Sequence, residues 1–166
     1  MLSARLKAVV EALPLRKGMK VLEIGCSTGA MARHMAECIE DGFVLGIDRS
    51  ATAIARAREM GTPDAALSRL AYRHASAADF SLPAGDDRFD LAVAIRVGAF
   101  DGRHVEEGMR SLPRILAALK PGAPFLIDHG DGLVDVRLMD WARPLGLSGQ
   151  TDPEKAGSGK TGSGHR

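Results

Sequence analysis

The sequence has little of several residue types that mark particular functions. Its 166 residues include two cysteines, Cys26 and Cys38, and no cysteine and histidine spacing typical of a metal site. Aromatic residues make up 4% of the chain, and the arginines are scattered without aromatics interleaved among them. Basic and acidic residues almost cancel, at 22 and 21. We therefore expect no metal, no nucleic-acid partner and no membrane partner.

No apolar run is long enough for a signal peptide or a membrane-spanning helix. Residues 1–13 place leucines and valines at helical spacing between charged residues, which predicts an amphipathic helix that packs on the domain. Cys26 lies in a glycine-rich turn, where a disulfide would disturb ligand access. These features favour a reducing environment, and we expect a cytoplasmic protein.

The length of the chain suggests one domain, large enough to bury a real core. We expect this domain to span residues 1–147. Residues 148–166 are rich in glycine and serine and show no strand or helix pattern, which predicts a flexible tail.

The most informative stretch is residues 19–29, with the sequence MKVLEIGCSTG. It predicts a buried strand, an acidic residue inside it, and then a tight turn of small residues. Residues 30–39 follow as a helix whose N-terminal amides face back toward the turn, where they would favour a carboxylate or a phosphate. Glu23 in turn favours a ligand with a cationic end. This order of elements is typical of a nucleotide-type site.

Glu23, Gly25 and Gly29 form a Glu-x-Gly-x-x-x-Gly pattern, which Gly46-Ile47-Asp48 follows. Together these resemble the first two motifs of class I S-adenosylmethionine-dependent methyltransferases. Residues 76–93 and 116–128 resemble later segments of the same family, in the same order, so the likeness covers roughly residues 15–130. Four segments in register make the resemblance specific, although the glycine turn alone would be weak.

The resemblance implies S-adenosylmethionine as cofactor and assigns its contacts. The turn would hold the methionine end of the cofactor, and Glu23 its ammonium group. Asp48 ends the predicted second strand, about where an acid accepts hydrogen bonds from ribose hydroxyls; its alternative role is to cap the next helix beside Ser50. The candidate cofactor contacts are Glu23, Gly25, Cys26, Ser27, Gly29, Asp48, Arg49, Asp79, Phe80 and Arg96.

Within this set, the resemblance places Arg49 near the adenine. It assigns Asp79 to the adenine amino group and Phe80 to the face of the ring. The plainer alternative is a loop acid beside a core phenylalanine.

The acceptor of the methyl group is expected at residues 96–104, after the fourth strand, because ligands bind where the strand order of an open parallel sheet reverses. This loop lacks the Asn/Asp-Pro-Pro-Tyr/Phe tetrad of many base and glutamine N-methyltransferases. We therefore expect a small-molecule acceptor. His104, with Asp101 nearby, is the candidate base if the acceptor must lose a proton.

From these patterns we predict an open, doubly wound, Rossmann-like α/β sheet of about five mostly parallel strands. Right-handed crossovers and the family resemblance imply the strand order 3-2-1-4-5. Residues 111–119 form a helix, either alone or as the continuation of one from His104. Residues 133–145 are predicted as a last helix. The two further strands of the family are not expected, which leaves strand five, at 125–127, as an open edge. A homodimer or a partner chain at that edge is one expectation, and cover by the last helix and tail is the other.

Two rival functions stay open. A catalytically degenerate domain would bind the cofactor or a partner without turnover, which the shortened fold favours. A nicotinamide-dependent oxidoreductase shares the fold, but its Gly-x-Gly-x-x-Gly pattern fails because Ser27 and Ala30 occupy two glycine positions.

Overall fold

The computed structural model describes residues 2–60, 69–128 and 132–138. The strands are β1 (Lys20–Ile24), β2 (Phe43–Asp48), β3 (Leu70–His74), β4 (Leu91–Ala94), β5 (Phe125–Asp128) and β6 (Leu133–Asp135). The helices are α1 (Ala4–Ala12), α2 (Ala30–Cys38), α3 (Ala51–Glu59), α4 (Val105–Ala118) and the 3₁₀ helix η2 (Val136–Leu138). No helix in this part of the chain is long and apolar enough to cross a membrane.

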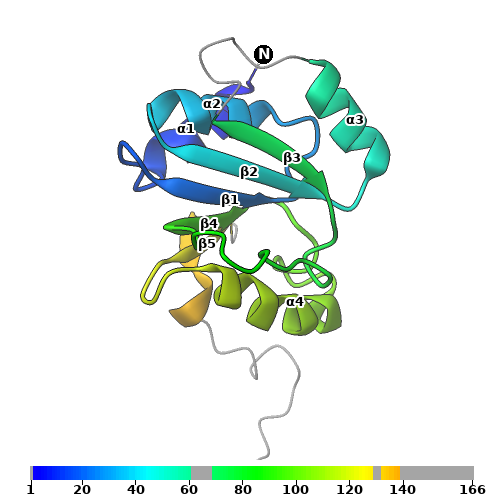
Figure 1. Cartoon of the computed structure of the whole chain (residues 1–166). Helices are drawn as coiled ribbons and strands as arrows, with labels where there is room; N and C mark the ends of the chain where they lie inside the picture. Colours follow the sequence, from blue (N-terminus) through cyan, green and yellow to red (C-terminus); the bar gives the residue numbers. More distant parts are fainter. Residues whose placement is uncertain (1, 61–68, 129–131, 139–166) are drawn as a thin grey trace, which may run out of the picture.

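The strands form one sheet in the order β3-β2-β1-β4-β5-β6 (Figure 1). The first five are parallel, and β6 runs antiparallel to β5. The predicted fold class and the order 3-2-1-4-5 are therefore confirmed. Strand β1 lies between β2 and β4, so both neighbours of β1 are parallel to it and its central residues are fully buried.

Helices cover both faces of the sheet (Figure 1). Alternate residues of each strand point to opposite faces, so β1 contributes Val21 to one core cluster and Leu22 to the other. The first cluster packs against α1 and α2, with Val10 and Met35 at its centre. The second packs against α4, where Ile115 is fully buried. The predicted N-terminal helix thus packs on the domain.

Local capping confirms two predicted helix starts. Ser50 Oγ accepts a hydrogen bond from the Ala53 amide at 3.2 Å and caps α3. Helix α2 starts at Ala30, directly after Gly29. Helix α4 is the longer of the two predicted forms, because it starts at Val105 and contains Pro113. Ser111 is therefore no cap; its hydroxyl donates to the Glu107 carbonyl at 2.7 Å inside the helix.

The end of the sheet differs from the prediction. Residues 133–135 form β6 and residues 136–138 form η2, so the predicted helix at 133–145 is wrong over these residues, and its remainder lies outside the described residues. The helical spacing of Val134 and Leu138 was misleading, since pairing with the apolar β5 satisfies the backbone groups of both strands. Strand β5 is not an open edge, and the reason for a partner chain there is removed.

The connection from β3 to β4, residues 75–90, contains no helix. It starts at the carboxyl end of β3, and its later part lies beside Lys20 and Phe43 at the amino ends of β1 and β2. Residues 61–68 lie outside the described residues. The boundary expected at residue 147 also lies outside them.

We expect Phe125→Ala to lower the free energy of unfolding by about 3–5 kcal/mol. Phe125 is fully buried in β5, and its ring meets the Phe100 ring edge-on, with centroids 4.9 Å apart. Urea unfolding would measure the loss, with Met109→Ala as control because Met109 is 49% exposed on α4. A loss below about 1 kcal/mol would contradict the packing described here.

Candidate functional site

The order of the strands opens a crevice between the carboxyl ends of β1 and β4. From β1 the chain proceeds to β2 on one side, and it returns to β4 on the other. Two cavities lie there. The strand-end cavity, of about 230 Å³, reaches from Asp48 to α4. The α1 cavity, of about 410 Å³, lies between α1 and the start of α2. Gly25 and Arg96 line both cavities.

The glycine turn adopts backbone angles that ordinary residues avoid. Gly25 has φ +72°, and a side chain there would approach Val97 Cγ2 to 2.6 Å. Ser27 follows with φ +50° and Gly29 with φ +73°. Because left-handed angles cost a side-chain-bearing residue energy, Ser27 must be held by its surroundings.

Asp48 supplies that hold. Its Oδ2 accepts a hydrogen bond from the Ser27 amide, and its Oδ1 accepts one from the Ser50 amide, both at 2.8 Å. The carboxylate therefore joins the end of β2 to the turn after β1 and to the start of α3. Asp48 also lines the strand-end cavity, as its predicted contact with a ribose requires.

The far side of the turn rests on Tyr72, a residue that sequence reasoning gave no role. Tyr72 Oη donates to the Gly29 carbonyl at 3.2 Å. Arg33 Nη1 donates to the Thr28 carbonyl at 3.0 Å and to Tyr72 Oη at 3.4 Å. Burial raises the pKa of Tyr72 to about 12, so the hydroxyl keeps its proton. The sequence does contain a signal for Tyr72. Gly46 is a glycine inside a buried strand, which indicates a large neighbouring side chain, and Tyr72 is the residue paired with Gly46 on the adjacent strand.

Glu23 is the unusual group of the site. Its side chain is 4% exposed, lines the α1 cavity, and has one carboxylate oxygen, Oε2, without a hydrogen-bond partner within the described residues. Burial raises the pKa of Glu23 to about 8, more than a hydrogen bond from the Ala32 amide lowers it. A buried carboxylate oxygen without a partner is costly, and a cationic ligand in the α1 cavity would relieve that cost.

Cys26 lies in the turn as predicted, and its side chain is 4% exposed. Its Sγ faces Gly46, where an added Cβ would lie 2.9 Å away. Burial raises the pKa of the thiol, so Cys26 is not a reactive nucleophile. Within residues 2–60, 69–128 and 132–138, no group of three histidine, cysteine or acidic side chains could hold a metal ion.

The predicted adenine contacts are placed less directly. Ser76 and Ala77 line the strand-end cavity, whereas Asp79 and Phe80 do not. Asp79 Oδ2 accepts a hydrogen bond from Ser76 Oγ at 2.6 Å, so Asp79 orients the lining serine. Phe80 is 1% exposed and lies in the hydrophobic core, as the alternative interpretation of that residue expected. Sequence reasoning missed two polar residues of this cavity, Ser76 and Glu107.

His104 and Arg49 face the strand-end cavity from opposite elements. His104 precedes α4, and its ring packs against Gly98, where an added Cβ would meet His104 Cδ2 at 2.6 Å. Arg49 follows β2 and forms an ion pair with Glu107 of α4 at 3.6 Å across the cavity. The predicted residues that follow β2 and β4 thus lie together at the carboxyl ends of the strands.

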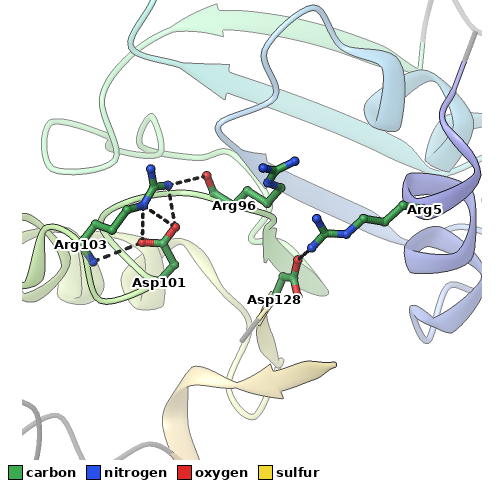
Figure 2. A network of polar contacts seen from close by, with 5 residues as sticks. All are labelled: Arg5, Arg96, Asp101, Arg103 and Asp128. Atoms are coloured by element: carbon green, nitrogen blue, oxygen red, sulfur yellow. Dashed lines mark hydrogen bonds and ion pairs between the residues drawn. The ribbon is translucent and has the colours of Figure 1, made fainter. Parts of the chain in front are cut away.

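Asp101 and His104 are not joined by a hydrogen bond. Arg103 Nε donates to both Asp101 oxygens at 2.9 Å, and Arg103 Nη2 donates to Oδ2 at 2.6 Å (Figure 2). This pairing holds the pKa of Asp101 below its usual range. Arg103 Nη2 also donates to the Arg96 carbonyl at 3.3 Å. Asp101 therefore orients Arg103.

Comparison with known proteins agrees with this geometry. Residues 21–122 match the methyltransferase domain family. The chain belongs to this family. The resemblance to class I S-adenosylmethionine-dependent methyltransferases is thereby confirmed, with S-adenosylmethionine as the cofactor of the family.

Three relatives show the extent of the likeness. An S-adenosylmethionine-dependent methyltransferase from Mesorhizobium loti is 32% identical with a TM-score of 0.56, over 74% of this chain and 50% of that one. The [4+2]-cyclase SpnF is 28% identical with a TM-score of 0.60, over 74% and 43%. A Neurospora crassa sterol 24-C-methyltransferase is 29% identical over 111 residues, 67% of this chain and 27% of that protein. This chain therefore spans half or less of each relative.

We expect Gly29→Ala to destabilise the protein by at least about 3 kcal/mol, because the new Cβ would lie 2.2 Å from Tyr72 Oη at a left-handed backbone position. In a Tyr72→Ala background only the backbone term remains, and the cost should fall to about 1–2 kcal/mol. Urea unfolding of all four proteins measures the coupling. Gly85→Ala is the control, since Gly85 has φ +91° and nothing within 4 Å. Equal costs in both backgrounds would exclude the clash.

Glu23 should make stability depend on pH. Its pKa rises from 4.5 to about 8 on folding, so the folded protein keeps a proton that the unfolded chain releases. The resulting stability is complete below about pH 4.5 and is lost as the pH rises through about 8. Relative to Glu23→Gln, the wild type should lose up to about 1.4 kcal/mol per pH unit in this window.

Urea unfolding at pH 5, 6, 7 and 8 tests this dependence. Glu59→Gln is the matched control, because Glu59 is exposed at the end of α3. Parallel curves for wild type and Glu23→Gln would show that Glu23 does not keep its proton.

Proposed function

We propose that this domain binds S-adenosylmethionine across the two cavities and transfers its methyl group to a small molecule. The observation that carries the proposal is the buried Glu23 oxygen beside the glycine turn, which has no partner among the residues that the structure describes. A structural role alone would favour an apolar residue at this position of a buried strand. The cofactor supplies an activated methyl group on a sulfonium.

The methionine end fits the α1 cavity. Glu23 would accept hydrogen bonds from its ammonium group, and the cation would return Glu23 to its charged form. The Ala32 amide already donates to Glu23. The Ala30 and Met31 amides, at the very start of α2, would take the carboxylate.

Gly25 lines both cavities, where the absence of a side chain lets the ligand approach the backbone closely. Gly29 lines neither cavity, and its missing side chain makes room for Tyr72.

The adenosine part fits the strand-end cavity. Each oxygen of Asp48 has one amide donor and keeps a free acceptor site, so ribose hydroxyls can bind without breaking the clamp on Ser27. Ser76, held by Asp79, and Arg49 border the space left for the adenine. Phe80 would support this wall from within the core. The remaining candidate, Arg96, lies where the cavities meet.

Catalysis of this kind is mainly alignment, because the nucleophile must approach the methyl group opposite the sulfur. The rigid turn and the clamp would fix the sulfonium in place. His104 lines the cavity and is the candidate base for an acceptor that must lose a proton. Asp101 would act indirectly, by holding Arg103, rather than by orienting His104.

Binding without turnover is the second candidate. One relative on this fold carries the name of a [4+2]-cyclase, so the fold is not tied to methyl transfer. The chain also spans about half of its solved relatives. Tight cofactor binding without methylation of any tested acceptor would support this candidate.

Calorimetric titration with S-adenosylmethionine and S-adenosylhomocysteine tests the proposal. We expect saturable binding with a dissociation constant on the order of micromolar. Asp48→Asn should weaken it about tenfold or more, because one amide of the clamp loses its acceptor and the ribose loses a charged partner. Asp41→Asn, an exposed site away from both cavities, should leave binding unchanged. Absence of binding by the folded wild type would overturn the proposal.

A further inference from the structure

Four arginines line the two cavities, and three of them have acidic partners. Arg5 pairs with Asp128 at 2.5 Å, Arg103 with Asp101 at 2.6 Å, and Arg49 with Glu107 at 3.6 Å. The guanidinium of the fourth, Arg96, has no hydrogen bond or ion pair to any residue in the described part of the chain. Figure 2 shows the Arg96 side chain between Arg103 and Arg5.

Arg96 is also held in a conformation that needs support. Its φ is +58°, and it is one of three residues other than glycine with a positive φ in the described ranges. The Arg103 guanidinium, fixed on Asp101, donates to its carbonyl at 3.3 Å. A strained residue that its neighbours hold in place, with a charged side chain left unused, indicates a binding role.

Arg96 was predicted as a cofactor contact, but the proposed arrangement of the cofactor leaves its guanidinium no cofactor group to bind. It lines both cavities, so it stands where the methionine and adenosine ends would meet and where an acceptor must approach. The cofactor carboxylate already has donors in the first turn of α2. Arg96 is therefore free for a different anion.

No acidic side chain in the described part of the chain pairs with the Arg96 guanidinium. Glu107 is paired with Arg49, and both oxygens of Asp48 accept backbone amides. Glu23 shares the α1 cavity with Arg96, but no ion pair joins the two, and in the proposed complex the charge of Glu23 faces the cofactor ammonium group. The Arg96 guanidinium is thus left without a carboxylate partner, and a guanidinium matches the planar, two-oxygen edge of a carboxylate or phosphate.

We propose that Arg96 binds an anionic group of the methyl acceptor, a carboxylate or a phosphate, at the junction of the two cavities. This inference rests on the proposed function, because the acceptor is defined by the cofactor beside it. Arg103 and Asp101 are positioning residues that hold the backbone of Arg96. The acceptor is then a small acid rather than a neutral molecule.

The test uses the full chain saturated with S-adenosylhomocysteine and titrated at constant ionic strength with benzoate, its neutral counterpart benzamide, and inorganic phosphate. We expect benzoate to bind about tenfold more tightly than benzamide, and phosphate to bind saturably. Arg96→Gln should abolish the preference for benzoate and Arg96→Lys should keep part of it. Arg110→Gln on α4, outside both cavities, should match the wild type.

Affinity for S-adenosylhomocysteine separates the two proposals. It should change less than about twofold in Arg96→Gln, since the cofactor contacts stay intact. A wild type that binds S-adenosylhomocysteine but shows no preference for benzoate would overturn this inference and leave the proposed function standing. A preference that persists in Arg96→Gln would do the same. A tenfold loss of S-adenosylhomocysteine affinity in that variant would reassign Arg96 to the cofactor carboxylate.

Discussion

The site depends on one carboxylate. Asp48 accepts the Ser27 amide on one oxygen and the Ser50 amide on the other, so a single side chain ties the turn after β1 to the end of β2 and the start of α3. Without it, the left-handed backbone at Ser27 has no compensating bond. Tyr72 and Arg33 secure the opposite side of the same turn through the Gly29 and Thr28 carbonyls. The turn is thus rigid before any ligand arrives.

This rigidity coexists with features that lower stability. Glu23 occupies a buried position in the most central strand, with one oxygen unsatisfied in the described part of the structure. Arg96 holds a left-handed backbone, and its guanidinium is unpaired within residues 2–60, 69–128 and 132–138. Both side chains line the α1 cavity. A protein selected only for stability would have an apolar residue at the first position and a glycine at the second, so the costs mark the places where ligands are expected to bind.

Ion pairs fix the positions of three of the four arginines that line the cavities. Asp128 pairs with Arg5 and Glu107 pairs with Arg49, both distant in the sequence. Asp101 pairs with Arg103 of its own loop. Exposed ion pairs of this kind add little stability. Their effect is to fix where the guanidinium groups lie, while Arg96 is left without an acidic partner among the described residues. The same pairing takes Asp101 away from His104.

Much of the fold and part of the site could be predicted from the sequence. The turn at 25–29 and the place of Asp48 follow from local patterns, because buried strands, glycines and helix caps depend on neighbours within a few residues. The strand order followed from right-handed crossovers and from the family resemblance. Three features could not be predicted from the sequence: the sixth strand, the support of the turn by Tyr72, and the pairing of Asp101 with Arg103. Strand β6 forms because the edge of β5 offers it hydrogen bonds, and that edge exists only in the assembled sheet. Tyr72 meets Gly29 across 43 residues of sequence. Asp101 pairs with Arg103, and not with His104, only once the loop after β4 is folded. Sequence patterns therefore determined which residues are candidates for the site, and the tertiary structure decided which of them face one another, since contacts between distant segments have no local signature.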